Sequence, residues 1–399
     1  MKTMPSIRDL ALENKAVFMR VDFNVPLEGK VITSDARIRA ALPTIKLALE
    51  KGARLALASH LGRPKGKKNP DYSMEPVGHR LSELLGGKDV VLADDCIGDG
   101  VAGLVQGLRP GQVLLLENLR FYKEEEGNDA EFSKKLAAPF QVYINDAFGA
   151  SHRAHASIVG MTKFFDDKSK GAGLLLEAEV KAIGKLLEGA EKPFVAVVGG
   201  AKVSDKIGVL DALIQRVDTL CIGGAMAYTF LKARGVEVGA SKWEGDKLQT
   251  ATDVIKRAKA RDVRLLLPVD HVVADVFDEN ATATVVADED VPEGKIGLDI
   301  GPQTRKLFSE AVDDAKTVFW NGPMGVFEWD KFSKGTTVIA EATAASSGYT
   351  VVGGGDSVAA IEKAGVADRI KHISTGGGAS LELLELGSLP GVDALTGKA

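Results

Sequence analysis

Residues 197–208 read VVGGAKVSDKIG and place an apolar run, a glycine pair and two lysines in succession. The run belongs to FVAVVGGAK (residues 194–202), whose unbroken apolar residues are typical of a strand buried on both faces of a parallel sheet. Lys202 and Lys206 are four residues apart, so on a helix they would share one face. The spacing differs from the G-x-x-x-x-G-K-[ST] pattern of a P-loop. The stretch therefore predicts a strand, a glycine turn and a helix, and raises the question of whether these lysines bind phosphate without a P-loop.

Apolar runs of the same kind recur along the chain, and helical patterns separate them. One such pattern covers residues 34–52, where Ser34 or Asp35 is a candidate cap, Pro43 is expected to restart the helix and Gly52 ends it. Alternation of buried strands and helices predicts an α/β fold with mostly parallel sheets and right-handed crossovers. The further runs are AVFMRVDFNV (16–25), ARLALASHLG (53–62), QVLLLENLRF (112–121), QVYINDAFGA (141–150), TLCIGGAMA (219–227), RLLLPVDHVV (264–273), TVFWNGPMG (317–325), YTVVGGGDS (349–357) and KHISTGGGAS (371–380).

The composition is that of a globular protein, with 399 residues, 45% of them hydrophobic, and a net charge of -5. This length favours two domains, and the negative charge argues against nucleic acid or an anionic membrane as a partner. Cys96 and Cys221 form no C-x-x-C pair, and we find neither a signal-peptide pattern nor an apolar stretch of membrane-spanning length. We therefore expect a cytoplasmic protein. The domain boundary is expected within residues 165–192, where a charged loop gives way to an amphipathic pattern.

Ligands of open α/β sheets bind beyond the carboxyl ends of the strands, so the residues after each run matter most. In the first half these residues are mainly cationic and amide side chains. Arginine presents a planar fork that suits carboxylate and phosphate, and several forks in one pocket would suit a small polyanion. For any single arginine, a surface charge or a structural salt bridge is the alternative. The candidate residues of this anion site are Asp22, Asn24, Arg37, His60, Arg63, Arg120 and Arg153.

Two features of the first half have competing interpretations. Asp22 could be taken for a general base, but we expect it to accept a hydrogen bond from a substrate hydroxyl or to orient an arginine. His152 and His155 lie close together, yet no cysteine or carboxylate motif accompanies them. A polar or substrate-facing loop is therefore favoured over a zinc site.

In the second half the runs end in glycine-rich loops, in which the backbone is not covered by side chains. Glycine lets backbone N–H groups approach phosphate closely, and the N-terminus of a following helix adds unpaired donors. GGGDS (353–357) and TGGGAS (375–380) each stand between an apparent strand and a helix, although each alone is also typical of an ordinary connection. Together with GGAK and GGAM they predict a nucleotide pocket.

Two carboxylates extend this pocket. Asp356 is the best magnesium candidate, because Mg²⁺ is usually held by one or two carboxylates together with substrate phosphates and water. Capping of the following helix is the alternative, and one residue can do both. Glu328 would reach a ribose hydroxyl. The alternative interpretation is that Glu328 is an exposed loop carboxylate without a role in binding. A small-anion half and a nucleotide half together indicate phosphoryl transfer, which depends on positioning and charge neutralisation. No G-x-G-x-x-G with a downstream acid is present, so a dinucleotide dehydrogenase is disfavoured.

At these residues the sequence resembles the phosphoglycerate kinase family, nearly end to end and in the same order. Several of the matching strings are long, which makes the resemblance specific. They are RVDFNVPL (20–27), RIRAALPTI (37–45), SHLGRPKG (59–66), LLENLRFYKEEEGND (115–129), NDAFGASHRAHAS (145–157), VVGGAKVSDKIGVL (197–210), LDIGPQT (298–304), FWNGPMGVFE (319–328), VVGGGDSVAAI (351–361) and ISTGGGASLELLELG (373–387).

The resemblance implies two Rossmann-like domains, each a mostly parallel sheet flanked by helices, joined by a hinge helix around a deep cleft. A phosphoglycerate-binding domain would span residues 1–170, and a C-terminal segment of roughly 380–399 would pack back on it. Residues 171–192 would form the connecting helix and residues 193–379 the nucleotide-binding domain. The implied reaction is reversible phosphoryl transfer from the acyl phosphate of 1,3-bisphosphoglycerate to Mg-ADP, giving 3-phosphoglycerate and ATP. The family also suggests a monomer.

The resemblance further implies roles for particular residues. The seven residues of the anion site would bind the phosphoglycerate, and Asp356 matches the position of the Mg²⁺ ligand. The positions expected to bind nucleotide are Lys202, Lys206, Gly223, Gly224, Gly297, Asn321, Glu328, Gly353, Gly354, Gly355, Asp356 and Ser357.

The implied chemistry needs no strong general base. In one direction ADP attacks an acyl phosphate, and in the other the acceptor is a carboxylate that is already ionised at neutral pH. We predict that Arg37 and Lys202 stabilise the transferring phosphoryl group from two sides, with backbone N–H groups of Gly376, Gly377 and Gly378 completing the cradle. Two alternatives stay open. A kinase for another carboxylate would not need four arginines, and a non-catalytic nucleotide-binding protein is disfavoured by the intact motif residues.

Overall fold

The computed structural model describes residues 4–397, and the chain divides into two compact units. The first unit extends to Lys181 and takes up the chain again from Ser388, and the second comprises Ala182–Gly387. Helix α6 (Leu174–Glu188) contains the point at which the chain passes from one unit to the other, and it lies within the range expected for a connecting helix. The expected ranges 1–170 and 193–379 fall inside the two units, whereas the C-terminal segment expected from about residue 380 joins the first unit only from Ser388.

The first unit is built on a six-stranded sheet in which every neighbouring pair is parallel, in the order β5-β6-β4-β1-β7-β8. The central strands are fully buried, which explains their unbroken apolar sequences. The strands are β1 (Ala16–Arg20), β4 (Arg54–Ala58), β5 (Val90–Leu92), β6 (Val113–Leu115), β7 (Val142–Asn145) and β8 (Lys170–Ala172).

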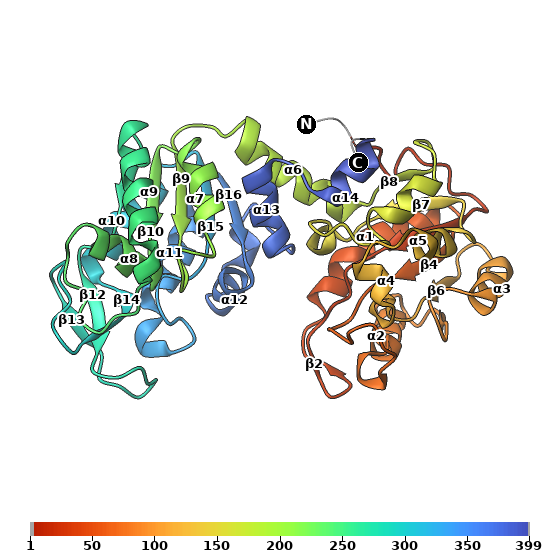
Figure 1. Cartoon of the computed structure of the whole chain (residues 1–399), viewed down its shortest axis with the longest axis horizontal. Coiled ribbons are helices and arrows are strands. Elements are labelled where there is room, and N and C mark those ends of the chain that lie inside the picture. Colours follow the sequence, from red (N-terminus) through yellow and green to blue (C-terminus); the bar gives the residue numbers. More distant parts are fainter. Residues whose placement is uncertain (1–3, 398–399) are drawn as a thin grey trace. The chain divides into compact units, whose positions relative to one another are not determined.

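The connections between these strands carry the helices of the unit, and a short antiparallel pair, β2 (Leu27–Glu28) with β3 (Val31–Ile32), precedes the first of them. Helix α14 (Pro390–Thr396) belongs to this unit and packs against β8, although the two segments are far apart in the sequence (Figure 1). The helices are α1 (Ala36–Glu50), α2 (Glu75–Leu84), α3 (Asp99–Gly107), α4 (Lys123–Glu126), α5 (Ala130–Ala137) and α14 (Pro390–Thr396).

Helix α1 differs from the expectation in two respects. It runs without interruption from Ala36 to Glu50 with Pro43 inside it, so this proline does not restart the helix. The Asp35 carboxylate makes no capping hydrogen bond, because it accepts from Arg39 at 2.8 Å and from Arg80 at 2.8 and 2.9 Å.

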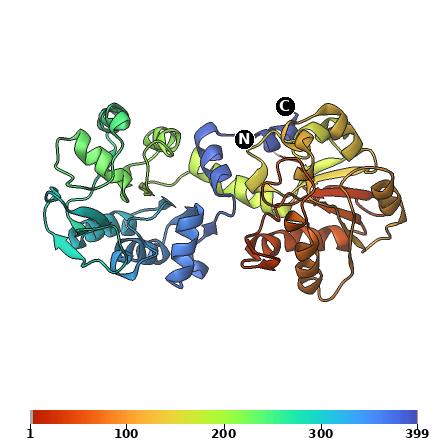
Figure 2. The ribbon, with the colours of Figure 1, turned by 60° about the horizontal axis from the view of Figure 1, so that its bottom comes forward.

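The second unit contains another parallel six-stranded sheet, in the order β11-β10-β9-β15-β16-β17. Figure 2 shows this unit from a second direction, with helices α12 (Gly355–Lys363) and α13 (Gly378–Leu386) in blue. The strands are β9 (Phe194–Val198), β10 (Thr219–Ile222), β11 (Arg264–Leu266), β15 (Thr317–Asn321), β16 (Tyr349–Gly353) and β17 (His372–Ile373). The α/β prediction with two mostly parallel sheets is confirmed.

A small antiparallel sheet in the second unit was not predicted. The run at 264–273 was interpreted as one strand, but it divides around Pro268 into β11 and β12 (His271–Ala274). Strand β12 pairs with β13 (Thr284–Val286) and β14 (Ile296–Ile300) in the order β13-β12-β14. The helices of the unit are α7 (Ile207–Ile214), α8 (Met226–Ala233), α9 (Leu248–Ala260), α10 (Pro302–Asp313), α11 (Lys334–Ala345), α12 (Gly355–Lys363) and α13 (Gly378–Leu386).

Each unit has its own hydrophobic core beneath its sheet. In the first, the core gathers residues of β1, β4 and α1, including Val17, Leu55 and Ile45. In the second it centres on β9, β15 and α10, where Trp320 and Phe308 are fully buried. A search of the described helices finds none with the length and apolar character needed to cross a membrane.

Candidate functional site

Residues of the candidate anion site lie beyond the carboxyl ends of four adjacent strands of the first unit. Asp22 follows β1, His60 follows β4, Arg120 lies in a 3₁₀ turn after β6, and Arg153 follows β7. Because the sheet order is β6-β4-β1-β7, these four loops leave the same edge of the sheet side by side. Arg37 comes from the first turn of α1. The strand order therefore brings together side chains that are up to about 130 residues apart in sequence.

Asp22 and Arg37 form an ion pair. Nη1 of Arg37 donates to the two carboxylate oxygens of Asp22 at 3.0 and 2.9 Å. The carboxylate is buried, while the arginine side chain is 37% exposed. Asp22 also accepts from the backbone N–H of Asn24 at 3.2 Å. These contacts support the interpretation of Asp22 as the residue that orients an arginine, and they leave the other end of the guanidinium available.

The loop after β4 is held by two of the predicted residues. The side-chain oxygen of Asn24 accepts from the N–H of Gly62 at 2.8 Å, and Nη1 of Arg120 donates to the Gly62 carbonyl at 2.9 Å. Arg120 is almost fully buried and also faces Glu126 at 3.4 Å. The next residue, Arg63, is exposed and has no partner within residues 4–397. The loop is thus fixed, and Arg63 extends from it.

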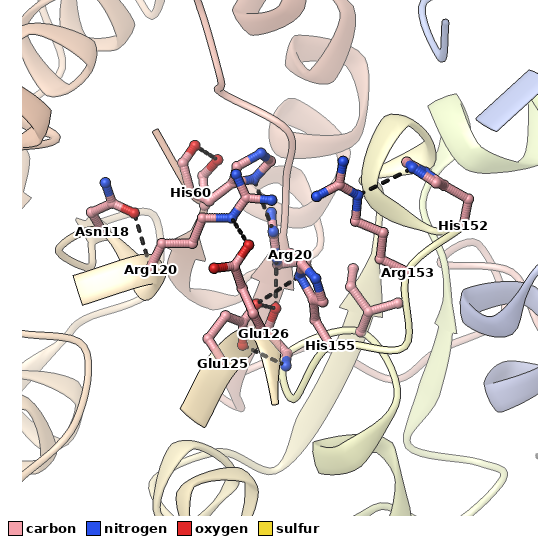
Figure 3. Close-up of polar contacts among 12 residues, drawn as sticks. Arg20, His60, Asn118, Arg120, Glu125, Glu126, His152, Arg153 and His155 are labelled. Carbon is pink, nitrogen blue, oxygen red and sulfur yellow. Dashed lines mark hydrogen bonds and ion pairs between the residues drawn. The ribbon is translucent and has the colours of Figure 1, made fainter. Parts of the chain in front are cut away.

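The histidines of this cluster lie among cations (Figure 3). Burial, followed by the charges of Arg20 and Arg120, holds the pKa of His60 well below its usual value. Burial and the same arginines lower the pKa of His155 to about 3. His152 accepts a hydrogen bond from Nε of Arg153 at 3.2 Å, and burial lowers its pKa as well. The histidines are therefore neutral at neutral pH, and the arginines supply the positive charge.

Behind these residues lies a buried polar group that the sequence analysis missed. Arg20 ends β1 and is fully buried, as is Glu125 of α4. Ser157 joins them, accepting from Nε of Arg20 at 2.8 Å and donating to Glu125 at 2.5 Å. The sequence gives one sign of this group, an arginine inside an otherwise apolar strand. An arginine is rarely buried in a strand unless its charge is paired.

The glycine loops of the second unit follow five adjacent strands, β10-β9-β15-β16-β17. Three side chains connect these loops. The amide nitrogen of Asn321 donates to the Gly353 carbonyl at 2.7 Å, and its oxygen accepts from Nζ of Lys206. The hydroxyl of the buried Ser357 accepts from the N–H of Gly322 at 2.6 Å. The side chains of Asn321 and Ser357 hold these loops and Lys206 in the structure, and their binding of nucleotide stays a prediction.

A cavity of about 280 Å³ opens beside these loops. Its lining is largely apolar with a few polar groups, as is usual for a small-molecule site. Glu328 and Asp356 line it, and both are exposed. Gly200, Gly224, Gly297, Phe277, Leu298, Met324 and Val326 contribute to the wall.

Two glycines of this wall are required by close approach. Gly224 has φ +68°, and a Cβ there would overlap the backbone of Gly200. A Cβ on Gly297 would overlap the hydroxyl of Tyr228, which is itself part of the lining. The neighbouring Gly223 is buried against Met324 and does not line the cavity.

The two lysines of the opening motif differ in their surroundings. Lys206 is half-buried, and its burial lowers its pKa in spite of the nearby Asp205 and Asp356. Lys202 is exposed and has no partner among the described residues. Its loop is anchored by Glu244, which accepts from the Ser204 hydroxyl at 2.6 Å and from the Ser204 N–H at 3.1 Å.

The last glycine loop leads into α13. The N–H of Gly376 donates to Ser374 at 3.2 Å, so this donor is already used within the loop. Gly377 and Gly378 follow at the first turn of the helix, where Gly377 has φ 50° and Gly378 is exposed. Gly354 and Gly355 stand in the same way at the first turn of α12. Both turns present backbone donors.

A larger hollow of about 860 Å³ lies elsewhere in the first unit, between α1 and α2. Its charged side chains are already paired with one another: Lys30 with Glu75, and Asp35 with Arg39 and Arg80. Both arginines that line this hollow are therefore paired, in contrast to Arg63 of the candidate anion site.

Comparison with known proteins assigns the chain to a family. The family model for phosphoglycerate kinase matches residues 7–386. The chain belongs to the phosphoglycerate kinase family. It is 57% identical over 399 residues to the phosphoglycerate kinase of Anaeromyxobacter sp. strain Fw109-5, covering 99% of this chain and all of that one. The solved phosphoglycerate kinase structures of Coxiella burnetii and Pyrococcus horikoshii have TM-scores of 0.89 and 0.82 at 42% and 32% identity, each over 99% of this chain and 99% and 100% of theirs.

Membership of the phosphoglycerate kinase family establishes the reaction. The protein is a kinase that transfers a phosphoryl group reversibly between 1,3-bisphosphoglycerate and ADP, a step of glycolysis. A nucleotide and a small acid are therefore its substrates. The rival interpretations, a kinase for another acid and a non-catalytic binding protein, are not supported.

Proposed function

We propose that the first unit binds the phosphoglycerate and the second unit binds the Mg²⁺ nucleotide. The observation that carries this assignment is the separation of two kinds of donor. Arginine side chains gather at the carboxyl edge of the first sheet, whereas backbone N–H groups and a lysine pair gather at that of the second. A compact acid with separate carboxylate and phosphate groups suits the first arrangement, and a chain of phosphates on an apolar base suits the second.

Arg37, Arg63, Arg120 and Arg153 provide the charge for the phosphoglycerate in this proposal. A guanidinium can donate two parallel hydrogen bonds to a phosphate or a carboxylate. The lowered pKa values of His60 and His155 support different roles for the two residue types. The arginines would neutralise the charge of the substrate, and the neutral histidines would add hydrogen bonds to it.

The nucleotide base would occupy the apolar cavity, with Glu328 at its rim near the ribose. Lys206 would hold nucleotide phosphate, and its contact with Asn321 supports this by fixing the direction of a long side chain. The first turn of α12, which contains Gly354 and Gly355, would add backbone donors.

Asp356 fits the role of a protein ligand to Mg²⁺. It is exposed, lines the cavity and lies within electrostatic reach of Lys206. Among the described residues no group of three or more His, Cys, Asp or Glu is arranged to hold a metal, which suits an ion held by one carboxylate and the nucleotide's own oxygens. When bound, Mg²⁺ would neutralise negative charge on the nucleotide phosphates.

The transfer itself needs no proton movement in this proposal. In the direction that consumes ATP, a carboxylate oxygen of 3-phosphoglycerate attacks the γ-phosphorus. The bond between that phosphorus and the bridging oxygen breaks, and ADP leaves with the electron pair. Arg37 and Lys202 would stabilise the group in transit, because both are positively charged and have donors free. Gly377 and Gly378 would add backbone N–H groups from the first turn of α13.

The assay for this proposal measures 3-phosphoglycerate-dependent formation of ADP from Mg-ATP, with the acyl phosphate product removed by a coupling dehydrogenase. We expect turnover that requires Mg²⁺. Light scattering of the same protein should give the mass of one chain, 42.2 kDa.

Asp356→Asn should raise the Mg²⁺ concentration for half-maximal rate by roughly tenfold, because the substitution removes the charge of one ligand. An unchanged Mg²⁺ requirement in this variant would remove Asp356 from the metal site. Asp368→Asn, in the same unit and outside the cavity, is the control.

A further inference from the structure

Arg20 is a buried cation that the proposed chemistry does not use. It is the last residue of β1, the strand paired with both β4 and β7, and its exposed fraction is 0%. A buried arginine is rare unless its charge is paired and its donors are satisfied. Glu125 and Asp22 supply the opposing charge.

All three nitrogens of the Arg20 guanidinium are engaged, on three different segments. Nε donates to Ser157 at 2.8 Å, Nη1 donates to the carbonyl of Val21, and Nη2 lies 3.1 Å from Nδ1 of His60. Figure 3 shows Arg20 between His60 and the Glu125 side of the cluster. Because the group is planar and held at three points, the direction of Nη2 is fixed.

We propose that Arg20 is a positioning residue that holds His60 in the neutral form with its hydrogen on Nε2, so that His60 presents a single N–H donor to the phosphoglycerate. This inference rests on the proposed binding of phosphoglycerate by the first unit.

The tautomer follows from the chemistry of the two groups. A guanidinium has five N–H donors and no acceptor, so in its contact with His60 it can only donate. Nδ1 of His60 must therefore accept and cannot carry a hydrogen. The ring's hydrogen is then on Nε2, which has no hydrogen-bond partner among residues 4–397.

The charges around His60 reinforce this assignment. Burial is the largest cause of the lowered pKa of His60, and the positive charges of Arg20, Arg120 and Arg37 lower it further. His155 also lies near enough to act on His60, but it is itself neutral at neutral pH. A neutral donor suits a pocket in which arginines already supply the positive charge. It adds a directed hydrogen bond without adding another cation that would repel the arginines.

Nitrogen-resolved NMR of the histidine rings tests the inference in the wild-type protein. His60 should show a hydrogen on Nε2 and none on Nδ1 throughout about pH 5 to 8, the range in which an ordinary histidine titrates. The His60→Gln spectrum identifies the signal. A hydrogen on Nδ1, or a protonated ring at pH 7, would overturn the proposal.

A pair of variants tests the same claim by kinetics. Glutamine can place an N–H near the position of Nε2, whereas asparagine reaches only the region of Nδ1. We expect the KM for 3-phosphoglycerate to rise about tenfold in His60→Asn and about threefold or less in His60→Gln, with kcat changed less than about twofold in both. The reverse order would contradict an Nε2 donor. An unchanged KM in both variants, with the predicted tautomer by NMR, would instead refute phosphoglycerate binding at His60.

The role of Arg20 itself is tested with Arg20→Met and Arg20→Lys. Arg20→Met removes the donor to Nδ1, so His60 should become a mixture of tautomers, begin to titrate below pH 7 and raise the KM by about tenfold. Arg20→Lys keeps a charge and one donor, and should lie between Arg20→Met and the wild type. A folded Arg20→Met protein with the wild-type tautomer and KM would show that Arg20 does not position His60. If neither variant folds, the wild-type spectrum and the His60 pair still decide the claim.

Discussion

Replacing Arg37 by alanine should lower kcat by about 100-fold or more, the usual loss when a preorganised donor to a transition state is removed. Arg37 stands at the first turn of α1 with one end of its guanidinium held by the Asp22 carboxylate. The orientation of its free donors therefore precedes substrate binding. Alanine removes the charge and the remaining N–H donors on Nε and Nη2, and water that enters in their place must reorganise during the reaction. Steady-state rates at saturating concentrations of both substrates measure the effect.

Arg39→Ala is the matched control, since it removes an arginine from the same helix two residues away. Arg39 is exposed and pairs with Asp35 at 2.8 Å. A surface pair of this kind contributes about 0.2–1 kcal/mol to stability, so kcat should stay within about twofold of wild type. If Arg37→Ala retains a kcat close to that of Arg39→Ala, Arg37 does not stabilise the transferring group.

Replacing Lys202 by alanine should also lower kcat by about 100-fold. Lys202 follows the glycine pair after β9, is exposed, and lies on a loop anchored through Ser204 to Glu244. A cation placed on a fixed loop without a protein partner is available to a phosphoryl group. Since the proposed contact forms mainly as charge develops, the KM for ATP should change much less than kcat.

Lys256→Ala serves as the control for Lys202, because Lys256 is an exposed lysine of the same unit, on α9, outside the cavity. It should leave kcat unchanged. A large increase in the KM for ATP with kcat preserved in Lys202→Ala would assign Lys202 to ground-state nucleotide binding, in contradiction to its proposed catalytic role.

The fold and the locations of both candidate clusters could be predicted because parallel strands impose two strong constraints. Burial on both faces gives apolar runs such as 194–198, and ligand groups then follow at the carboxyl ends. His60 and Arg120 were found in this way. The small sheet of β12, β13 and β14 was missed because residues 264–273 were interpreted as one strand, although Pro268 and Asp270 lie between β11 and β12.

The hydrogen-bond partners of individual side chains could not be predicted, because they depend on which strands are neighbours in the sheet. Arg20 and Ser157 are 137 residues apart, and Lys206 and Asn321 are 115 apart. No local pattern encodes such pairs. The resemblance predicts that Asn321 binds nucleotide, and the structure adds that its amide holds the Gly353 loop and Lys206 in place. Arg20 was noticed only as part of an apolar run, although a charge at such a position is itself a signal.

The central claim, that each unit binds its own substrate, is tested most directly by calorimetric titration of 3-phosphoglycerate and of Mg-ADP separately into two variants. Arg63→Ala removes an exposed arginine of the first unit, and Lys206→Met removes a half-buried lysine of the second. Loss of one charge-assisted hydrogen bond should weaken binding roughly 10- to 100-fold. We predict that Arg63→Ala weakens only 3-phosphoglycerate and that Lys206→Met weakens only Mg-ADP. Weakening of the same ligand by both substitutions would contradict the assignment.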